Sequence, residues 1–190
     1  IVLSVNQFAR EGEKARLIDS GSGSHFGWKL FEVCERKQEP FKQHAIPGTI
    51  EAEDYDAGCP GEAYYDKNEI NEGGAYRLNE GVDIEKCSAG GYNVGWIRKG
   101  EFLCYSVTVS KSGTYQVSFN VASPYESGAY YLECDRKNIT GTVKIPDTKG
   151  FQNWETVKTT VHLNAGQHII KWVSEGENFN IDNIVFELSE

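Results

Sequence analysis

The stretch GGYNVGWIRKGEFLCYSVTV, from Gly90 to Val109, decides the fold class of this chain. From residue 102 onward its side chains alternate between apolar and more polar, which predicts a half-buried β-strand. The apolar set expected to face the core is Leu103, Tyr105, Val107 and Val109. The glycine-rich turn ahead of this strand delivers Trp96 at a loop end, where an indole is suited to contact a flat ligand. Phe102 points to the opposite, more polar face of the strand.

The rest of the chain has the same short period and predicts an all-β protein. Besides residues 101–109, we expect strands over 49–54, 114–122, 129–134, 140–145, 155–163, 168–173 and 180–187. Glycine-containing turns separate them at even spacing, and no helical stripe competes. The pattern indicates an antiparallel β-sandwich of jelly-roll type. Residues 58–91 show no sustained alternation, as is typical of a long functional loop.

Composition restricts the classes of partner. The 190 residues carry a formal net charge of -9, which disfavours a nucleic-acid partner because phosphate binding needs clustered cations. No apolar run approaches the ~18 residues of a membrane-spanning helix, so no membrane partner is expected. The chain contains no Met, even at position 1, which suggests an excised fragment or a processed product. We expect a secreted, cell-surface or periplasmic protein whose targeting signal is absent from this chain.

The first 44 residues differ in pattern from the rest. A strand-like opening, a charged run and a Gly/Ser patch at 20–24 precede GWKLFEV, residues 27–33, which alternates as a strand should. The polar stretch from Glu35 to His44 is typical of a linker. We therefore predict that residues 1–44 are the end of an upstream β-rich module plus a linker, and that residues 45–190 form the sandwich.

The five cysteines show no CxxC spacing, which gives a zinc or redox motif little support. If the protein is extracellular, Cys59 and Cys87 are the best-placed pair, because both lie in loops where a disulfide would constrain the long loop between them. Cys134 falls in a strand alternation and is interpreted as a small buried hydrophobe. His168 is interpreted as a buried or half-buried structural residue, and no Ser, His and acid arrangement is supported.

Five segments in this order resemble carbohydrate-binding module family 6. They are IPGTIEAEDYD (46–56), GGAYR (73–77), GVDIE (81–85), GGYNVGWIRKGEFLCY (90–105) and FNIDNI (179–184). The resemblance runs from about Ile46 to Leu188. It implies a non-catalytic β-sandwich appended to polysaccharide-degrading enzymes, with sugars bound among the loops at one end or on the concave sheet face.

For the loop-end site the resemblance implies Trp96, a second aromatic at Phe151 and an amide at Asn180. This set suits a pyranose, because two rings can clamp its apolar C–H face while an amide reads its hydroxyls. The family usually has tryptophan where this chain has Phe151, so we expect modest affinity. Loop tyrosines are expected to form a wall of the same site: Tyr92, Tyr64 and Tyr65. For the concave-face site the resemblance implies Phe102 with the acid Glu62; this is the weaker site, since the long loop would cover that face.

Metal binding is predicted at one acidic cluster. Glu51 and Glu53 are two residues apart, hence on one face of an extended strand, and Asp182 on the last strand would complete a set of hard oxygen ligands. The resemblance implies a structural calcium here, with the Arg77 carbonyl as a further ligand. The alternative is a solvated acidic edge.

Non-catalytic binding of a plant or algal cell-wall polysaccharide, targeting an attached glycoside hydrolase, is the function predicted. The alternatives are a chain within a glycoside hydrolase whose catalysis lies upstream, or a surface lectin or adhesin without an enzyme. Glycoside hydrolysis needs two carboxylates flanking a cleft, and no acid here sits in a recognisable catalytic context. The expected partners are a polysaccharide or oligosaccharide and a covalently attached catalytic module, and we expect the chain to be a monomer.

Overall fold

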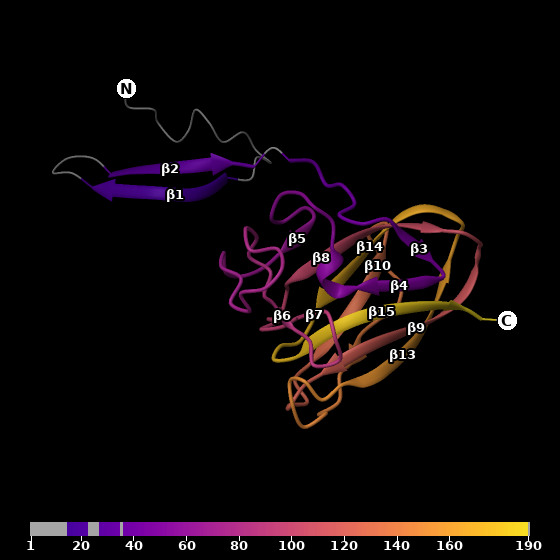
Figure 1. Ribbon diagram of the computed structural model, residues 1–190. Coiled ribbons are helices and arrows are strands. Elements are labelled where there is room, and N and C mark those ends of the chain that lie inside the picture. The colour runs from indigo at the N-terminus through magenta and orange to yellow at the C-terminus, as the bar shows by residue number, and fades with distance from the viewer. Residues whose placement is uncertain (1–14, 23–26, 35, 190) are drawn as a thin grey trace.

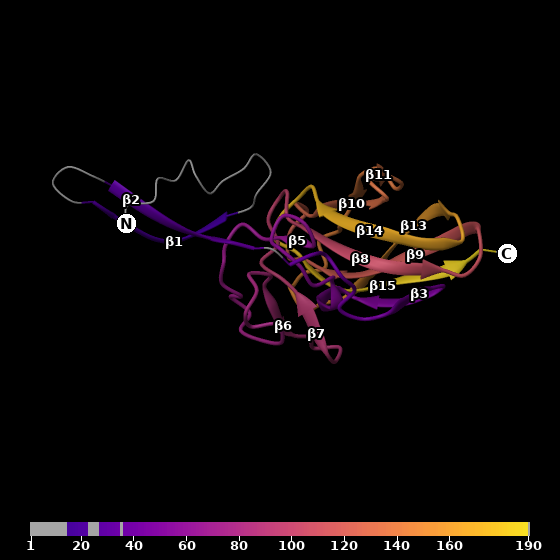
Figure 2. The same cartoon turned by 90° about the horizontal axis from the view of Figure 1, so that it is seen from above.

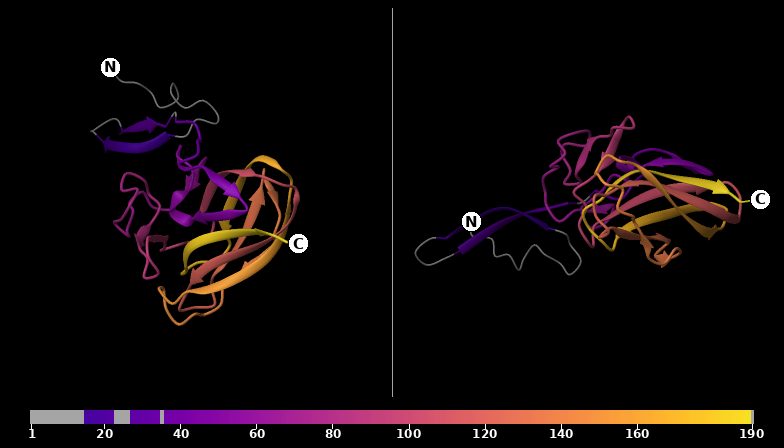
Figure 3. Two further views of the ribbon diagram at one scale, coloured as in Figure 1. Left: turned by 45° about the vertical axis from the view of Figure 1, so that its right-hand side comes forward. Right: turned by 90° about the horizontal axis from the view of Figure 1, so that it is seen from below.

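A computed structural model describes residues 15–22, 27–34 and 36–189 of the chain. The opening strand expected before residue 15 lies outside these residues. Two sheets stack face to face around one core, as Figure 1 shows, which confirms the all-β sandwich. A separate hairpin of β1 (Ala15–Ser22) and β2 (Gly27–Val33) extends away from the sandwich in every view (Figures 2 and 3).

Each sheet combines long central strands with short edge strands. The first has the order β11-β10-β14-β8-β3, with β12 pairing with β10 and β5 with β8. Its strands are β3 (His44–Ile46), β5 (Tyr64–Tyr65), β8 (Phe102–Val109), β10 (Ala129–Cys134), β11 (Lys137–Asn138), β12 (Val143–Lys144) and β14 (Gly166–Ser174). The pair β3–β8 is parallel.

The second sheet has the order β13-β9-β15-β7-β6, with β4 pairing with β15. Its strands are β4 (Gly48–Glu51), β6 (Ile84–Lys86), β7 (Tyr92–Val94), β9 (Gly113–Ala122), β13 (Glu155–Leu163) and β15 (Asn180–Leu188). The predicted long strands thus exist with small shifts at their ends. The short strands β5 and β6 lie inside the segment 58–91 expected to be a loop, and β7 follows directly after it.

The core lies between the sheets and is built by the alternation seen in the sequence. The inward residues of β8 are buried as predicted, and large aromatics from the facing strands complete the packing. Phe119 and Tyr130 meet across the sandwich with ring centroids 4.4 Å apart, and Trp172 packs against Phe179 at 5.8 Å. Aromatic pairs at such distances add to the stabilisation that burial of apolar area provides.

Two strand predictions fail at their ends for lack of a pairing partner. The strand expected over 49–54 ends at Glu51, which pairs with Asn183, and residues Ala52–Asp54 form a short 3₁₀ helix instead. The strand expected over 140–145 shrinks to β12, which pairs with the start of β10. Alternation alone does not show where a neighbouring strand stops.

The predicted disulfide is wrong. Cys59 bonds to Cys34 rather than to Cys87, with a Cα–Cα distance of 5.7 Å. The segment before β3 folds back beside Cys59, where Glu39 and Ala57 form a bridge, while Cys87 is buried close to Asp182. The disulfide therefore ties the end of the hairpin to the sandwich. Cys134 is half-buried and packs against the core, near to its interpretation from sequence.

Within the residues that the structure describes, no helix is long and apolar enough to cross a membrane.

Candidate binding site

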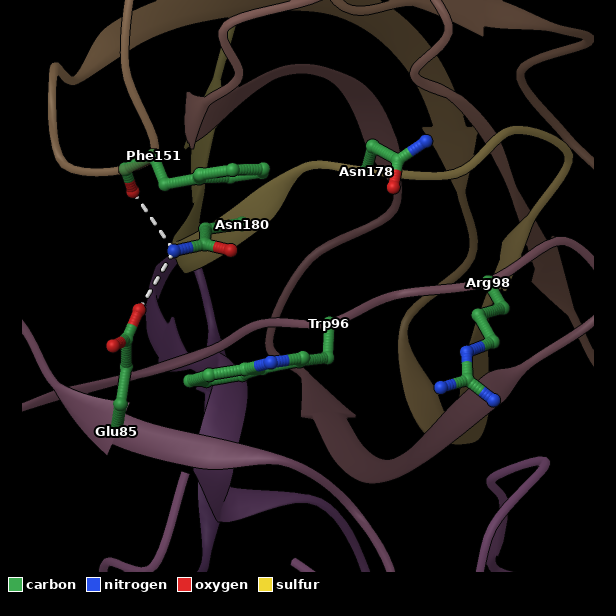
Figure 4. Close-up of a pocket in the computed structure, with 6 residues that line it drawn as sticks. All are labelled: Glu85, Trp96, Arg98, Phe151, Asn178 and Asn180. Atoms are coloured by element: carbon green, nitrogen blue, oxygen red, sulfur yellow. Dashed lines mark hydrogen bonds between the residues drawn. The ribbon is translucent and has the colours of Figure 1, made fainter. Parts of the chain in front are cut away.

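A pocket of about 320 Å³ opens among the loops at one end of the sandwich. Figure 4 shows the rings of Trp96 and Phe151 on opposite sides of the Asn180 side chain, so the structure brings together the three residues predicted to form the site. Trp96 is 42% and Phe151 42% exposed, which makes both rings available to a ligand. The remaining lining residues are Glu85, Arg98 and Asn178.

Trp96 has an unusual backbone conformation. Its φ is 48°, in the left-handed region that bulky residues rarely adopt. Such positions concentrate at functional sites, where the surrounding fold holds them. Here the next residue, Ile97, is buried in the core, and its carbonyl accepts the Asn178 N–H at 3.0 Å. The indole is thereby fixed at the pocket mouth.

Asn180 presents one kind of polar atom to the pocket. Its Nδ2 donates to Glu85 Oε1 at 2.9 Å and to the Phe151 carbonyl at 2.8 Å, which uses both amide hydrogens. The Oδ1 atom is left as an acceptor between the rings (Figure 4). The backbone approaches closely here, since a Cβ on Gly95 would lie 2.8 Å from that Oδ1. The Asn180 side chain can therefore only accept a further hydrogen bond, through Oδ1.

Glu85 orients this amide. Its Oε1 accepts from Asn180, from Gln152 Nε2 at 2.8 Å and from Asn93 Nδ2 at 3.3 Å. Gln152 in turn accepts the Ser88 N–H at 2.8 Å. One carboxylate oxygen therefore joins β6, β7, β15 and the loop that carries Phe151. Glu85 lies in the motif GVDIE, but its role is not visible in the sequence, because the three amides that converge on it come from segments distant along the chain.

A buried hydroxyl network supports the other side of the pocket. Ser123 Oγ lies 2.7 Å from the Asn178 carbonyl oxygen and 2.9 Å from that of Tyr125, and these two acceptors share its single hydrogen. Thr148 Oγ1 accepts the Ser123 N–H at 2.9 Å. These contacts fix three loops relative to one another. Tyr125 is 53% exposed and meets Phe151 edge-on with ring centroids 6.1 Å apart. No pattern in the sequence singled out Tyr125 or Arg98.

The tyrosines expected as pocket walls lie elsewhere. Tyr92 stacks on Tyr76 with centroids 4.9 Å apart and packs against the core. Tyr65 pairs in register with Phe102 across β5 and β8, which directs it to the outer face of the first sheet, and Tyr64 is buried. The pairing of β5 and β7 with their neighbouring strands decides which way these tyrosine side chains point, and that pairing is not visible in the sequence of the loop.

The predicted second site is partly covered. Phe102 is half-buried, with Tyr65 at 6.1 Å between centroids and the Lys171 Nζ atom 3.7 Å from its ring centroid. An ammonium over an aromatic face is attracted by the ring quadrupole. A sugar would have to displace it. Glu62 is exposed, and its backbone carbonyl lies 3.4 Å from Cys104 Sγ.

The acidic residues predicted to bind metal gather around one position. β4 runs antiparallel to β15, which brings Glu51 beside Asp182, while Glu53 lies in the 3₁₀ helix rather than on the extended strand expected. Burial raises the pKa of Glu53 to about 8, and the carboxylates of Asp54, Glu51 and Asp182 raise it as well. Glu53 Oε2 is buried and has no hydrogen-bond partner among the described residues. A buried, unpartnered carboxylate beside others fits a hard cation.

Arg77 lies next to this cluster. Its guanidinium is buried, pairs with Glu80 at 2.8 Å and donates to the Tyr55 carbonyl, while Nη1 lies 3.4 Å from the Glu53 carbonyl oxygen. The Arg77 carbonyl accepts the Glu80 N–H at 3.1 Å. The side chain therefore has a structural role, and metal binding by the carbonyl stays a prediction.

Comparison with known proteins identifies the family. The sequence model of the carbohydrate binding module (family 6) matches residues 72–188. The chain belongs to carbohydrate-binding module family 6. It is therefore a non-catalytic carbohydrate-binding module, in agreement with the resemblance seen in the sequence.

Solved structures of similar proteins share the fold of the module. The C-terminal family 6 module of the laminarinase LamC from Zobellia galactanivorans is 29% identical, with a TM-score of 0.57 over 72% of this chain and 95% of that one. A family 6 module of Cellvibrio mixtus lichenase 5A, in complex with cellotriose, is 28% identical, with a TM-score of 0.58 over 76% of this chain and 99% of that one.

A curated relative is much longer than the module. The clotting factor G alpha subunit of Tachypleus tridentatus is 25% identical over 135 residues, which is 70% of this chain and 19% of that protein. The chain thus spans about a fifth of the relative that it matches.

Proposed function

We propose that the module binds a β-linked glucan through the pocket formed by Trp96, Phe151 and Asn180. One observation carries this proposal: two exposed rings lie on opposite sides of an amide whose hydrogens are both committed to the protein. A pyranose fits between such rings, because its C–H faces are apolar and its hydroxyls project from the rim. The free Oδ1 of Asn180 accepts from one of those hydroxyls.

The ligand class follows from the rings and from the relatives together. Each stacked ring contributes of order 1 kcal/mol beyond the burial of area. Modules 28–29% identical come from a laminarinase and from a lichenase, and the latter is bound to cellotriose. These names support a glucan with β-linkages over other cell-wall polysaccharides. Arg98 at the pocket edge adds donors, with its side chain 46% exposed.

The module is proposed to hold an attached glycoside hydrolase on its substrate. Tethering raises the effective concentration of a catalytic domain near an insoluble polysaccharide. The similar modules are parts of degradative enzymes, which supports this role. The Cys34–Cys59 disulfide supports an oxidising location, secreted or at a cell surface.

A structural calcium is part of the proposal. Glu51, Glu53, Asp182 and the Arg77 carbonyl would hold it, and the ion would supply the positive charge that the clustered carboxylates lack. The orphaned Glu53 Oε2 supports this assignment. A calcium bound there would connect the end of β4 to the first residues of β15, the strand that also carries Asn180.

Affinity electrophoresis of Trp96→Ala tests the sugar site. We expect wild type to be retarded by laminarin and lichenan more than by xylan or algal galactan, and Trp96→Ala to lose that retardation. Phe102→Ala is the matched control, because it removes an aromatic from the sheet face and leaves the pocket intact. Unchanged migration of Trp96→Ala would overturn the pocket, and loss confined to Phe102→Ala would move the site to the sheet face.

A further inference from the structure

A cluster of ligand-forming side chains lies away from the sugar pocket. Cys134 ends β10, Asp135 follows it in the turn, and His168 lies near the start of β14. A sulfur, a carboxylate oxygen and an imidazole nitrogen of these residues lie within 4.8 Å of one another. The sheet itself makes the cluster, because Cys134 pairs with Ile170. The pocket residue Asn178 follows the opposite end of β14.

Both ring nitrogens of His168 face hydrogen-bond acceptors. Its Nδ1 lies 2.7 Å from Asp135 Oδ2 and its Nε2 lies 2.9 Å from the Asn164 carbonyl. Both partners are acceptors, whereas a neutral imidazole carries one N–H. A second proton or a metal ion has to lie on the other nitrogen. Asp135 is held in place by its Oδ1, which accepts the Ile169 N–H at 3.0 Å.

We propose that Cys134, Asp135 and His168 bind a divalent transition-metal ion of the zinc class. Thiolate, imidazole and carboxylate are the donors that zinc prefers, and three protein ligands plus a water are a common set. The carbonyl of Asn164 then takes the Nε2 hydrogen, as the outer partner of a metal-bound histidine usually does. Thiol and imidazole donors make calcium an unsuitable ion here.

Two adjustments accompany binding. The 2.7 Å between Nδ1 and Oδ2 is shorter than the ~3.3 Å between two ligands of a tetrahedral zinc, so the exposed Asp135 side chain has to turn outward slightly. Burial, and then the nearby Asp135, raise the pKa of the Cys134 thiol to about 11, so the metal displaces a thiol proton on binding. The ion then cross-links the end of β10 to the start of β14.

Cobalt titration of the full chain, with calcium present in excess, tests the site. We expect one equivalent of Co²⁺ to give a thiolate-to-metal charge-transfer band that Zn²⁺ abolishes by competition. Cys134→Ser should lose the band, and His168→Gln should weaken Co²⁺ binding by about tenfold or more. Cys104→Ser, a buried cysteine on β8, should keep it. Circular dichroism of each variant shows whether it is folded.

Several results would overturn the proposal. One is the absence of a charge-transfer band in folded wild type. Another is a band that survives in Cys134→Ser, because it would assign the thiolate to another cysteine. If the chemical shifts of the His168 ring do not change when Zn²⁺ is added, a proton alone occupies Nδ1. Glucan retardation should be unchanged in all of these variants, so failure here and failure of the sugar site are separable.

Discussion

Glu85 shows how a residue that offers no aromatic ring can still shape the pocket, by orienting the side chains around it. One carboxylate oxygen accepts three amide hydrogens, and this fixes which atom of Asn180 faces the pocket. Hydrogen bonds to a charged acceptor contribute roughly 1.5–3 kcal/mol, against 0.5–1.5 for neutral ones.

Glu85→Gln should weaken glucan binding by about fivefold, because the amide of Asn180 loses a charged partner worth about 1 kcal/mol more than a neutral one. Isothermal titration with a soluble β-glucan measures this. Gln116→Glu, an exchange of the same pair of groups on β9, is a control expected to leave affinity unchanged. Equal affinity of Glu85→Gln and wild type would remove Glu85 from the site.

Phe151→Trp should tighten binding by about two- to fivefold, since a larger ring offers more stacking area to the same pyranose face. Phe151→Ala should weaken it by at least as much. The paired variants distinguish a platform from a residue that merely caps the sandwich, because a capping role predicts loss in both. Titration calorimetry on folded proteins measures the two changes.

At the scale of elements, the segment 58–91 carries both the pocket residue Glu85 and two partly buried aspartates, Asp66 and Asp83. Asp83 lies just before β6, and its Oδ1 accepts the Glu72 N–H at 2.6 Å. Asp66 and Asp83 each have a pKa raised to about 6, in both cases mainly by burial. Neighbouring carboxylates contribute, including Glu101 beside Asp66. The segment is thus held by buried polar groups as well as by the apolar side chains that it contributes to the core, among them Tyr64 and Ile84.

Asp66→Asn should stabilise the fold at neutral pH by roughly 1 kcal/mol, a value reduced for partial exposure. The folded state binds the Asp66 proton with a pKa of about 6, against an ordinary 3.8, so wild-type stability falls as pH rises between these values. The advantage of the variant should therefore vanish below about pH 4. Urea unfolding at several pH values measures it; a constant difference across pH would contradict the assignment.

At the scale of the molecule, β4, the first strand of the second sheet, pairs with β15, the last strand of the chain, beside the clustered carboxylates. Repulsion among the carboxylates of Glu51, Glu53 and Asp182 would oppose the pairing of the two strands. Burial of these groups makes the repulsion stronger. The proposed calcium would convert that repulsion into a cross-link between chain segments that are distant in sequence.

Chelation should lower the melting temperature by about 5–10 °C, the shift expected when a ligand near 100 times its Kd is removed from a domain of this size. Added Ca²⁺ should restore it. Glu53→Gln should melt at one temperature with and without chelator, while Glu187→Gln, an exposed acid on the same strand as Asp182, should respond like wild type. A chelator-insensitive wild type would contradict a structural calcium.

The sequence by itself determined the sandwich, the core face of β8 and the family, because strand alternation and ordered short motifs are local properties. The family resemblance also implied Trp96, Phe151 and Asn180, which the structure brings together in one pocket. It failed where pairing between distant segments decides: the partner of Cys59, the end of β4, and the direction of Tyr65 and Tyr92.

Only the tertiary structure decided how the site works. The convergence of three amides on Glu85 and the acceptor left on Asn180 depend on β6, β7 and β15 lying side by side. The cluster of Cys134, Asp135 and His168 likewise exists only because β10 pairs with β14. Alternation specifies which face of a strand is buried, whereas register and neighbour order specify which side chains meet.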